Sequence, residues 1–297
     1  MNRFDQGYLA LLQDIMENGE DRMDRTGVGT RAVWCRTLRH DLKDGLPALT
    51  TKKVAVKTAI KELLWFLTGD TNIQPLVRQN VPIWTDWPLK AYREATGEQI
   101  AQGDFERRIA EDDAFAAQWG DLGPVYGKQW RRWLGADGRE YDQIAEVERK
   151  LKEKPWDRRI IFTGWNVPEL DRMALPPCHH TYQFSTIGGR LNAFLYQRSC
   201  DTFLGVPFNV VSLGVLTTML AQATGWEPGE IVWTGTDVHI YQNHFDVVRQ
   251  QMARPGNDSL PRLEIARPVD SIDDIRLEDL QVTGYTHDGE LRAPVAV

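Results

Sequence analysis

Two neighbouring stretches decide how this chain is interpreted: A-L-P-P-C-H-H-T-Y-Q-F from Ala174 to Phe184, and Y-Q-R-S-C-D-T-F-L-G-V-P-F-N from Tyr196 to Asn209. In the first, Cys178 follows two prolines, which restrict the backbone and remove amide donors, so we expect a stiff approach to the thiol. The thiolate is the reactive form of cysteine, and a neighbouring cation such as Arg198 stabilises it. The two stretches together predict a nucleophilic cysteine.

The second stretch also carries groups that suit a phosphorylated heterocycle. Arg198 and Ser199 suit a phosphate, because the guanidinium is planar and charged and the hydroxyl adds a donor. The amide of Asn209 can donate and accept side by side, which matches one edge of a pyrimidine ring. Cys35 and Cys200 have no comparable neighbours in the sequence, so we expect them to be structural thiols.

Composition restricts the class of protein. The chain has 297 residues, of which 42% are hydrophobic and 26% charged, as is usual for a globular protein. We see no run of about 18 apolar residues and no apolar leader, and therefore expect neither a membrane span nor a secretory signal. Three cysteines argue against a disulfide framework and for a cytoplasmic, reducing environment. The net charge of −7 gives no indication of non-specific nucleic-acid binding.

The hydrophobic pattern predicts an α+β fold around one sheet. Helices are expected where apolar residues recur at helical spacing, over 5–18, 55–69 and 208–224. Strands are expected over 31–43, 159–163, 181–197, 231–234 and 262–266. Strands and helices are interleaved without regular βα repeats, which favours α+β over a parallel α/β sheet. The polar segment 88–118 is predicted to be a small, helical, solvent-facing insertion in a single catalytic domain of residues 1–297.

Along the whole chain, the motifs resemble those of the thymidylate synthase family. Besides the two opening stretches, motifs in the family's order are Asp24-Arg25-Thr26-Gly27, Thr50-Thr51-Lys52, the run from Glu62 to Leu67, Ile83-Trp84, the run from Gly120 to Gly127, Asp157-Arg158-Arg159, the run from Asp237 to Tyr241, and the end from Ala293 to Val297. The resemblance implies a mixed, twisted sheet, surrounded by helices and packed against a second copy in a homodimer. It also implies dUMP as substrate, 5,10-methylenetetrahydrofolate as co-substrate, no metal and no obligatory nucleic acid.

The resemblance assigns roles in nucleotide binding. Cys178 would attack C6 of the uracil ring, so that C5 becomes nucleophilic, and Asn209 would read the base. His239 and Tyr241 would bind the ribose 3′-hydroxyl. The phosphate would be bound by four arginines and a serine: Arg25, Arg158, Arg159, Arg198 and Ser199. Of these, Arg158 and Arg159 would reach into the site of the partner subunit.

The resemblance also assigns the folate contacts. Asp201 would bind the pterin ring, and Trp84 and Trp87 would pack on the folate. Lys52 would meet the glutamate tail. The C-terminal Val297 would close over the bound folate.

Glu62 lies among apolar residues of a predicted helix, where a carboxylate without a partner is costly to bury. Its neighbours leave two interpretations open, a packing ion pair or a general acid/base with a raised pKa. The resemblance selects the second, and Tyr126 and His179 would extend the same proton network.

The chain departs from the family pattern at three places. Thr85 stands where the family has Asp, Val210 to Gly214 replace I-A-S-Y-A, and Thr236 replaces Gly. In the family the methylene intermediate is either reduced by the folate, which gives dTMP and dihydrofolate, or hydrated in a sibling branch, which gives 5-hydroxymethyl-dUMP. Since a lost carboxylate and a reshaped helix could admit water, we favour the hydroxymethyl product, with dTMP as the alternative.

Two other classes are disfavoured. An inactive nucleotide- or RNA-binding family member would not need Cys178, Asn209 and the arginines. A cysteine hydrolase would need a base and an orienting group for acyl transfer, and no motif supplies them.

Overall fold

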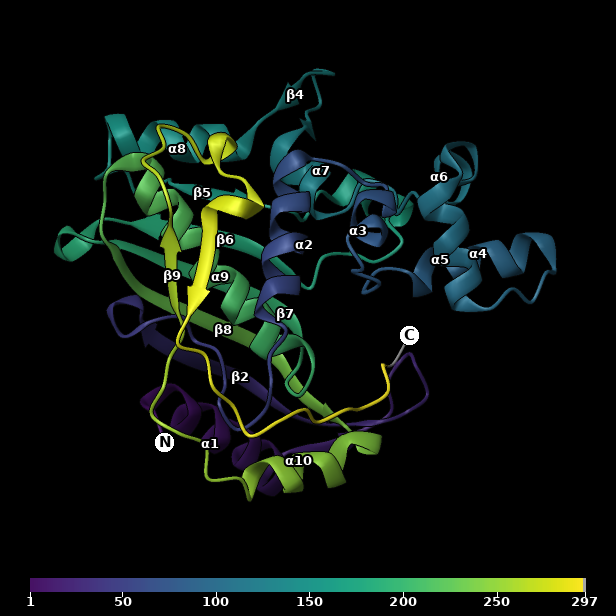
Figure 1. Ribbon diagram of the computed structural model, residues 1–297, viewed down its shortest axis with the longest axis horizontal. Helices are drawn as coiled ribbons and strands as arrows, with labels where there is room; N and C mark the ends of the chain where they lie inside the picture. The colour runs from purple at the N-terminus through teal and green to yellow at the C-terminus, as the bar shows by residue number, and fades with distance from the viewer. Residues whose placement is uncertain (296–297) are drawn as a thin grey trace. The chain divides into compact units, whose positions relative to one another are not determined.

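A six-stranded mixed sheet organises the chain. The computed structural model describes residues 1–295. The strand order is β1-β2-β8-β7-β6-β5 (Figure 1). Strands β7 and β8 are parallel, whereas β2 with β8 and β6 with β7 are antiparallel. The bounds are β1 Glu20–Arg22, β2 Thr30–Asp41, β5 Ile161–Thr163, β6 His179–Ser185, β7 Leu191–Asp201 and β8 Pro228–Tyr241. The predicted α+β class and mixed sheet are confirmed.

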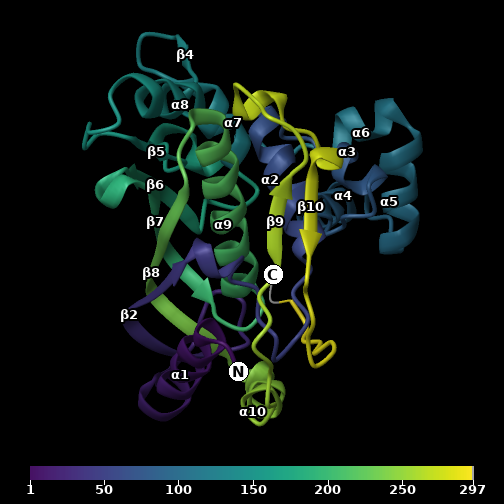
Figure 2. The ribbon, with the colours of Figure 1, turned by 60° about the vertical axis from the view of Figure 1, so that its left-hand side comes forward.

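Contacts divide the described chain into two compact units. The first unit contains 1–60, 146–161 and the residues from 178 on, and the second contains 61–145 and 162–177. Helices of the first unit are α1 Arg3–Asn18, α9 Gly205–Thr224 and α10 Phe245–Met252, and its remaining strands are β9 Arg262–Ile265 and β10 Leu280–Thr283. Helix α9 lies along β7 and β8, as Figures 1 and 2 show. By length and composition α9 could cross a membrane, but 72% of its most apolar window is buried inside the protein, which identifies it as a core helix.

Regular pairing is interrupted at one level across four strands of the sheet. Cys35 on β2 and Thr236 on β8 face each other without pairing. Arg198 on β7 is skipped at the same level, and the β6–β7 register shifts at His180. Cys35 also has a positive φ of 55°, where glycine is the usual residue. The ladder is therefore distorted beside Cys178, which immediately precedes β6.

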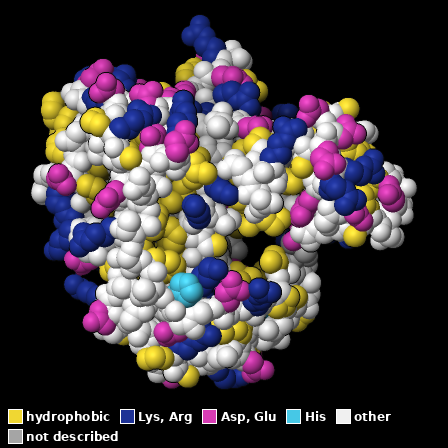
Figure 3. Space-filling model, viewed as in Figure 1, with side chains coloured by type: hydrophobic (Ala, Val, Ile, Leu, Met, Phe, Trp, Pro, Cys, Tyr) yellow, Lys and Arg dark blue, Asp and Glu magenta, His cyan; other side chains and the backbone are white. Residues whose placement is uncertain are grey.

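The second unit is mostly helical. It contains α3 Gln74–Arg78, α4 Asp86–Thr96, α5 Gln102–Glu111, α6 Asp113–Trp119, α7 Tyr126–Arg131 and the short strands β3 Trp133–Leu134 and β4 Glu140–Tyr141. Helices α2 Val56–Thr68 and α8 Gln143–Glu153 each contribute residues to both units. Within α4–α6, the rings of Tyr92, Phe105 and Phe115 pack together at centroid distances of 5.4–5.6 Å. Figure 3 shows basic and acidic side chains interspersed over the surface of these three helices.

The predicted helices 5–18, 55–69 and 208–224 are confirmed as α1, α2 and α9. The single strand pattern over 181–197 was wrong, because the chain turns at Ile187–Gly189 and forms two strands. Gly188 and Gly189 both have positive φ there, at 80° and 76°, and this adjacent pair was the signal in the sequence for the turn. The strand predicted over 231–234 extends over the whole of β8.

Candidate active site

Cys178 and Arg198 meet at the interrupted end of β6 and β7. The guanidinium Nη2 of Arg198 lies 4.0 Å from Cys178 Sγ, and the amide of Arg198 donates to the carbonyl of Cys178 at 2.9 Å. Cys178 is half-buried, so the thiol keeps some access to solvent. A guanidinium at this distance favours the thiolate, which is the nucleophilic form. The pairing predicted from the two opening stretches is therefore present in space.

A chain of hydrogen bonds orients Asn209. The indole of Trp233 donates to Gln197 Oε1 at 2.8 Å, and Gln197 Nε2 donates to Asn209 Oδ1 at 3.1 Å. Gln197 is buried, so this relay fixes which atom of the Asn209 amide is the oxygen. No motif singled out Gln197, because its role depends on residues 12 and 36 positions away in the chain.

His239 and Tyr241 lie together at the end of β8, as their spacing predicted, with ring centroids 5.2 Å apart. Asp237 Oδ1 bonds His239 Nδ1 at 2.9 Å, and Arg22 Nη2 donates to Asp237 Oδ2 at 2.5 Å. The bonds from His239 and Arg22 hold the pKa of Asp237 below its usual value. Arg22 and Asp237 thus orient the imidazole, a role that was not predicted.

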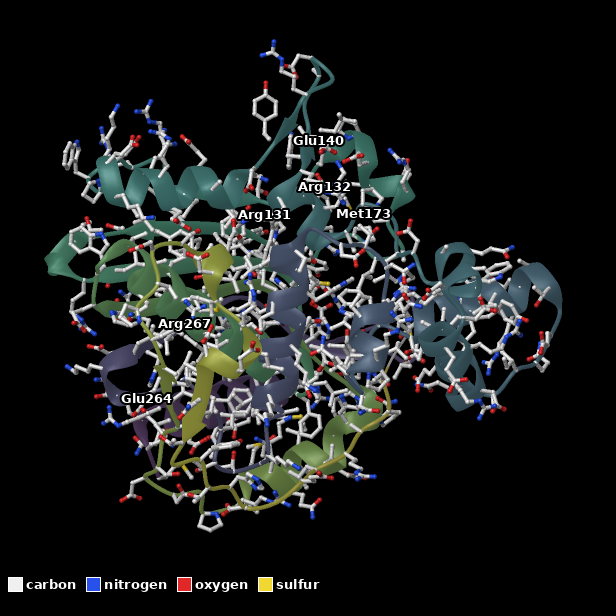
Figure 4. All side chains as sticks on the ribbon, turned by 45° about the horizontal axis from the view of Figure 1, so that its top comes forward. Arg131, Arg132, Glu140, Met173, Glu264 and Arg267 are labelled. Atoms are coloured by element: carbon white, nitrogen blue, oxygen red, sulfur yellow. The ribbon has the colours of Figure 1, made fainter. Side chains whose placement is uncertain are left out.

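The predicted phosphate arginines occupy three places in the first unit. Arg198 and Ser199 are adjacent at the end of β7. Arg25 is exposed in a loop that Asp24 holds through bonds from Thr26 and Gly29. Arg158 and Arg159 are exposed in the loop after α8. By contrast, Arg131, Arg132 and Arg267, labelled in Figure 4, have structural partners: Asp142, the carbonyl of Gly69 and Asp279.

Glu62 is a buried carboxylic acid in the second unit. Its side chain is 6% exposed, and Trp84 Nε1 donates to its Oε1 at 2.8 Å. Burial raises the pKa of Glu62 to about 7, against a smaller opposing effect of the Trp84 bond. The hydrogen-bond partner found for it is an indole and not a cation, which favours the acid/base interpretation over the packing ion pair. Tyr126 is buried close by, edge-on to Trp84 at 5.7 Å.

The predicted folate residues lie in both units. Asp201 Oδ1 accepts from the amides of Phe203 and Leu204, both at 3.0 Å, and so holds the turn into α9. Lys52 is only 5% exposed and donates to the carbonyl of Phe203. Burial lowers the pKa of Lys52 to about 7. In this conformation Lys52 points inward, so it would have to turn outward to meet a glutamate tail.

Other predicted positions are placed as follows. Trp87 is half-buried, with its ring 5.2 Å from Trp84. His179 is buried, Nδ1 lies 2.7 Å from the hydroxyl of Tyr182, and burial lowers the pKa of His179 to about 3, which keeps the ring neutral. Val297 lies outside the described residues.

No cluster of three or more His, Cys, Asp or Glu that could hold a metal ion occurs within residues 1–295.

A thiol beside a guanidinium, an oriented amide and an imidazole held by a carboxylate are the kinds of groups that nucleophilic catalysis uses. The family model described as thymidylate synthase matches residues 6–297. Similar proteins include "Thymidylate synthase" of Rhodopseudomonas palustris, 56% identical with 98% of each chain covered, and of Cereibacter sphaeroides, 56% identical with 99% of each covered. That of Zymomonas mobilis is 53% identical, with 98% of each covered.

The chain therefore belongs to the thymidylate synthase family, and it is a one-carbon transferase. Members of this family bind dUMP and use 5,10-methylenetetrahydrofolate as co-substrate.

Proposed function

We propose that this protein is a thymidylate synthase, which transfers the methylene group of 5,10-methylenetetrahydrofolate to C5 of dUMP and reduces it to a methyl group. The products are dTMP and dihydrofolate. The relatives named thymidylate synthase, at 53–56% identity over nearly the whole chain, carry the proposal. They favour this outcome over the hydroxymethyl product that we favoured from the sequence.

The site supports a consistent set of roles. The thiolate of Cys178, stabilised by Arg198, adds to C6 of uracil and makes C5 able to attack the one-carbon unit. Asn209, oriented by Gln197, reads the base, and His239 and Tyr241 bind the ribose. Glu62, with a pKa of about 7, can both accept and donate a proton near neutral pH.

The product decides the proposal directly. We would incubate the protein with dUMP and methylenetetrahydrofolate, identify the nucleotide by mass spectrometry, and measure dihydrofolate. One dihydrofolate formed per dUMP consumed, with a nucleotide heavier by one methylene, supports thymidylate synthase. A nucleotide heavier by a methylene and an oxygen, with tetrahydrofolate retained, would overturn the proposal in favour of the hydroxymethylase.

We also propose a cytoplasmic homodimer that packs through the sheet. Buried residues of β7 and β8 alternate with half-buried ones, so one face of these strands is covered by the core and the other is open. The open face carries Phe194, Tyr196 and Val232, a composition suited to a subunit interface. Trp156 is 77% exposed beside Arg158 and Arg159, as expected if this loop reaches a partner. The three cysteines are thiols and not disulfides, which fits a reducing compartment.

Shared sites can be tested by subunit mixing. The variant Cys178→Ala and the double variant Arg158→Ala with Arg159→Ala should each be inactive alone. Random exchange of subunits should restore up to roughly a quarter of wild-type activity, because half the dimers then hold one complete site. Subunit exchange is verified by mass-tagged pull-down. If exchanged mixtures have no activity, Arg158 and Arg159 do not contribute to the partner's site.

A further inference from the structure

The chain after β10 continues within the first unit as a tail, which Figure 1 shows in yellow passing α10 on its way to the C-terminus. Its first part is held firmly by the loop that precedes α2. The amide of Asp288 donates to the carbonyl of Thr50 at 2.8 Å, and the amide of Lys53 donates to the carbonyl of Gly289 at 3.0 Å. Arg254 Nη1 donates to the carbonyl of Gly289 at 3.0 Å as well.

Beyond Glu290 the tail has far fewer attachments. Within the described part of 291–295, we find one hydrogen bond to an element outside the tail, from His244 Nε2 to the carbonyl of Pro294 at 2.8 Å. Pro294 and Val295 are themselves exposed, so burial does not fix them. The position of this segment therefore depends on His244.

The surroundings of His244 orient its ring toward this contact. The residue is 0% exposed, and its ring lies 5.6 Å from Phe203 and 5.5 Å from Tyr241. A carbonyl can only accept, so Nε2 must carry the proton. Nδ1 has no hydrogen-bond partner among the described residues. The hydrogen bond found for this buried ring is thus made to the tail.

The two residues whose rings pack against His244 are linked to the candidate site. Tyr241 is one of the two residues assigned to the ribose, and the amide of Phe203 bonds Asp201, which is assigned to the pterin. Lys52 also donates to the carbonyl of Phe203. His244 therefore joins Pro294 of the tail to Tyr241, which is assigned to the ribose, and to Phe203, which is bonded to the residue assigned to the pterin.

We propose that His244 is a positioning residue that anchors the C-terminal tail through Pro294 and thereby controls retention of the folate. This inference rests on the proposed function for its kinetic consequence. The anchor itself does not depend on that function, because it concerns the docking of the tail alone.

The test compares His244→Leu, which removes the donor, with His244→Gln, whose Nε2 can replace it. His40→Leu is the matched control, because His40 is also buried and makes the same bond, Nε2 to the carbonyl of Gly45 at 2.8 Å, far from the tail in sequence. Each protein is digested with a carboxypeptidase in the absence of substrates, and the loss of C-terminal residues is followed by mass spectrometry.

We expect His244→Leu to be trimmed about tenfold faster than wild type, since trimming follows the population of the undocked tail. His244→Gln and His40→Leu should be trimmed at close to the wild-type rate. In turnover, His244→Leu should raise the KM for methylenetetrahydrofolate more than it lowers kcat. The anchor would be overturned if His244→Leu were trimmed at the wild-type rate. It would also be overturned if either His244→Gln or His40→Leu were trimmed fast. If wild type makes no dTMP, the proposed function fails, while the trimming result still decides the anchor.

Discussion

Replacing Glu62 with Gln should stabilise the folded protein at alkaline pH and remove its activity. Burial raises the pKa of Glu62 from 4.5 to about 7. Between these two pH values the unfolded chain has lost the proton and the folded chain still holds it, so the free energy of unfolding falls as pH rises. The total fall is about 3 kcal/mol, at roughly 1.4 kcal/mol per pH unit. Gln is neutral and keeps an oxygen for the Trp84 indole, so the variant avoids this loss.

The assay is denaturant unfolding at one protein concentration, because the proposed dimer would make the measured stability depend on concentration. At about pH 8 the free energy of unfolding of the variant should exceed that of wild type by about 3 kcal/mol, which corresponds to about 5 °C in Tm. This gain should nearly vanish by about pH 4.5. Its kcat should fall about 100- to 10,000-fold.

Glu148→Gln is the control, because this buried carboxylate accepts from Lys152 at 2.7 Å and from the amide of Ile272 at 3.0 Å. That variant should lose stability at about pH 8. A Glu62→Gln protein no more stable than wild type at about pH 8 would refute the raised pKa.

Three further changes test the rest of the site and the sheet. Cys178→Ala should abolish turnover and leave dUMP binding measurable by calorimetry, and lost binding would mean that the thiol is structural. Cys35→Gly should raise stability by about 1 kcal/mol in thermal unfolding, because it relieves the positive φ of 55° at an exposed residue. Cys35→Ala should give no such gain, and equal stabilities of the two variants would contradict the strain. Asp237→Ala should raise the KM for dUMP about tenfold by freeing the His239 ring, and an unchanged KM would show that the ring needs no support.

The parts of the fold that follow local patterns could be predicted from the sequence. Helices α1, α2 and α9 were predictable because their apolar residues repeat within the segment itself. The interruption at Cys35, Thr236 and Arg198 was not, because it arises from the register between strands that are far apart in the chain.

The candidate site divides in the same way. Cys178, Arg198 and Asn209 could be named because each lies in a recognisable motif. The roles of Gln197, Asp237 and His244 could not be predicted, although the first two lie in such motifs, because each acts by contacting another side chain or carbonyl in space. Glu62 is intermediate, since its helix predicted burial and its neighbours in the sequence left two interpretations open, of which the contact with Trp84 favours the acid/base one.

Thr85 shows how the structure bears on the choice of product. From the sequence we expected that Thr85, which replaces a carboxylate of the family, could help to admit water to the methylene intermediate. Its side chain is 0% exposed, and Oγ1 has no hydrogen-bond partner among the described residues. The backbone amide and carbonyl of Thr85 are bonded to Pro82 and Leu89, both at 3.0 Å, so the residue is well fixed. A buried hydroxyl without a partner destabilises the folded state.

Thr85→Val keeps the branched shape and removes the hydroxyl, so it should be neutral or stabilising by up to about 1 kcal/mol. If Thr85 does not direct water to the intermediate, the variant should also form dTMP and dihydrofolate in the same ratio as wild type. Mass spectrometry of the nucleotide, together with the dihydrofolate yield, measures that ratio. A change in the share of 5-hydroxymethyl-dUMP would show that the hydroxyl organises water after all. The departure from the family pattern at this position would then be a determinant of the product.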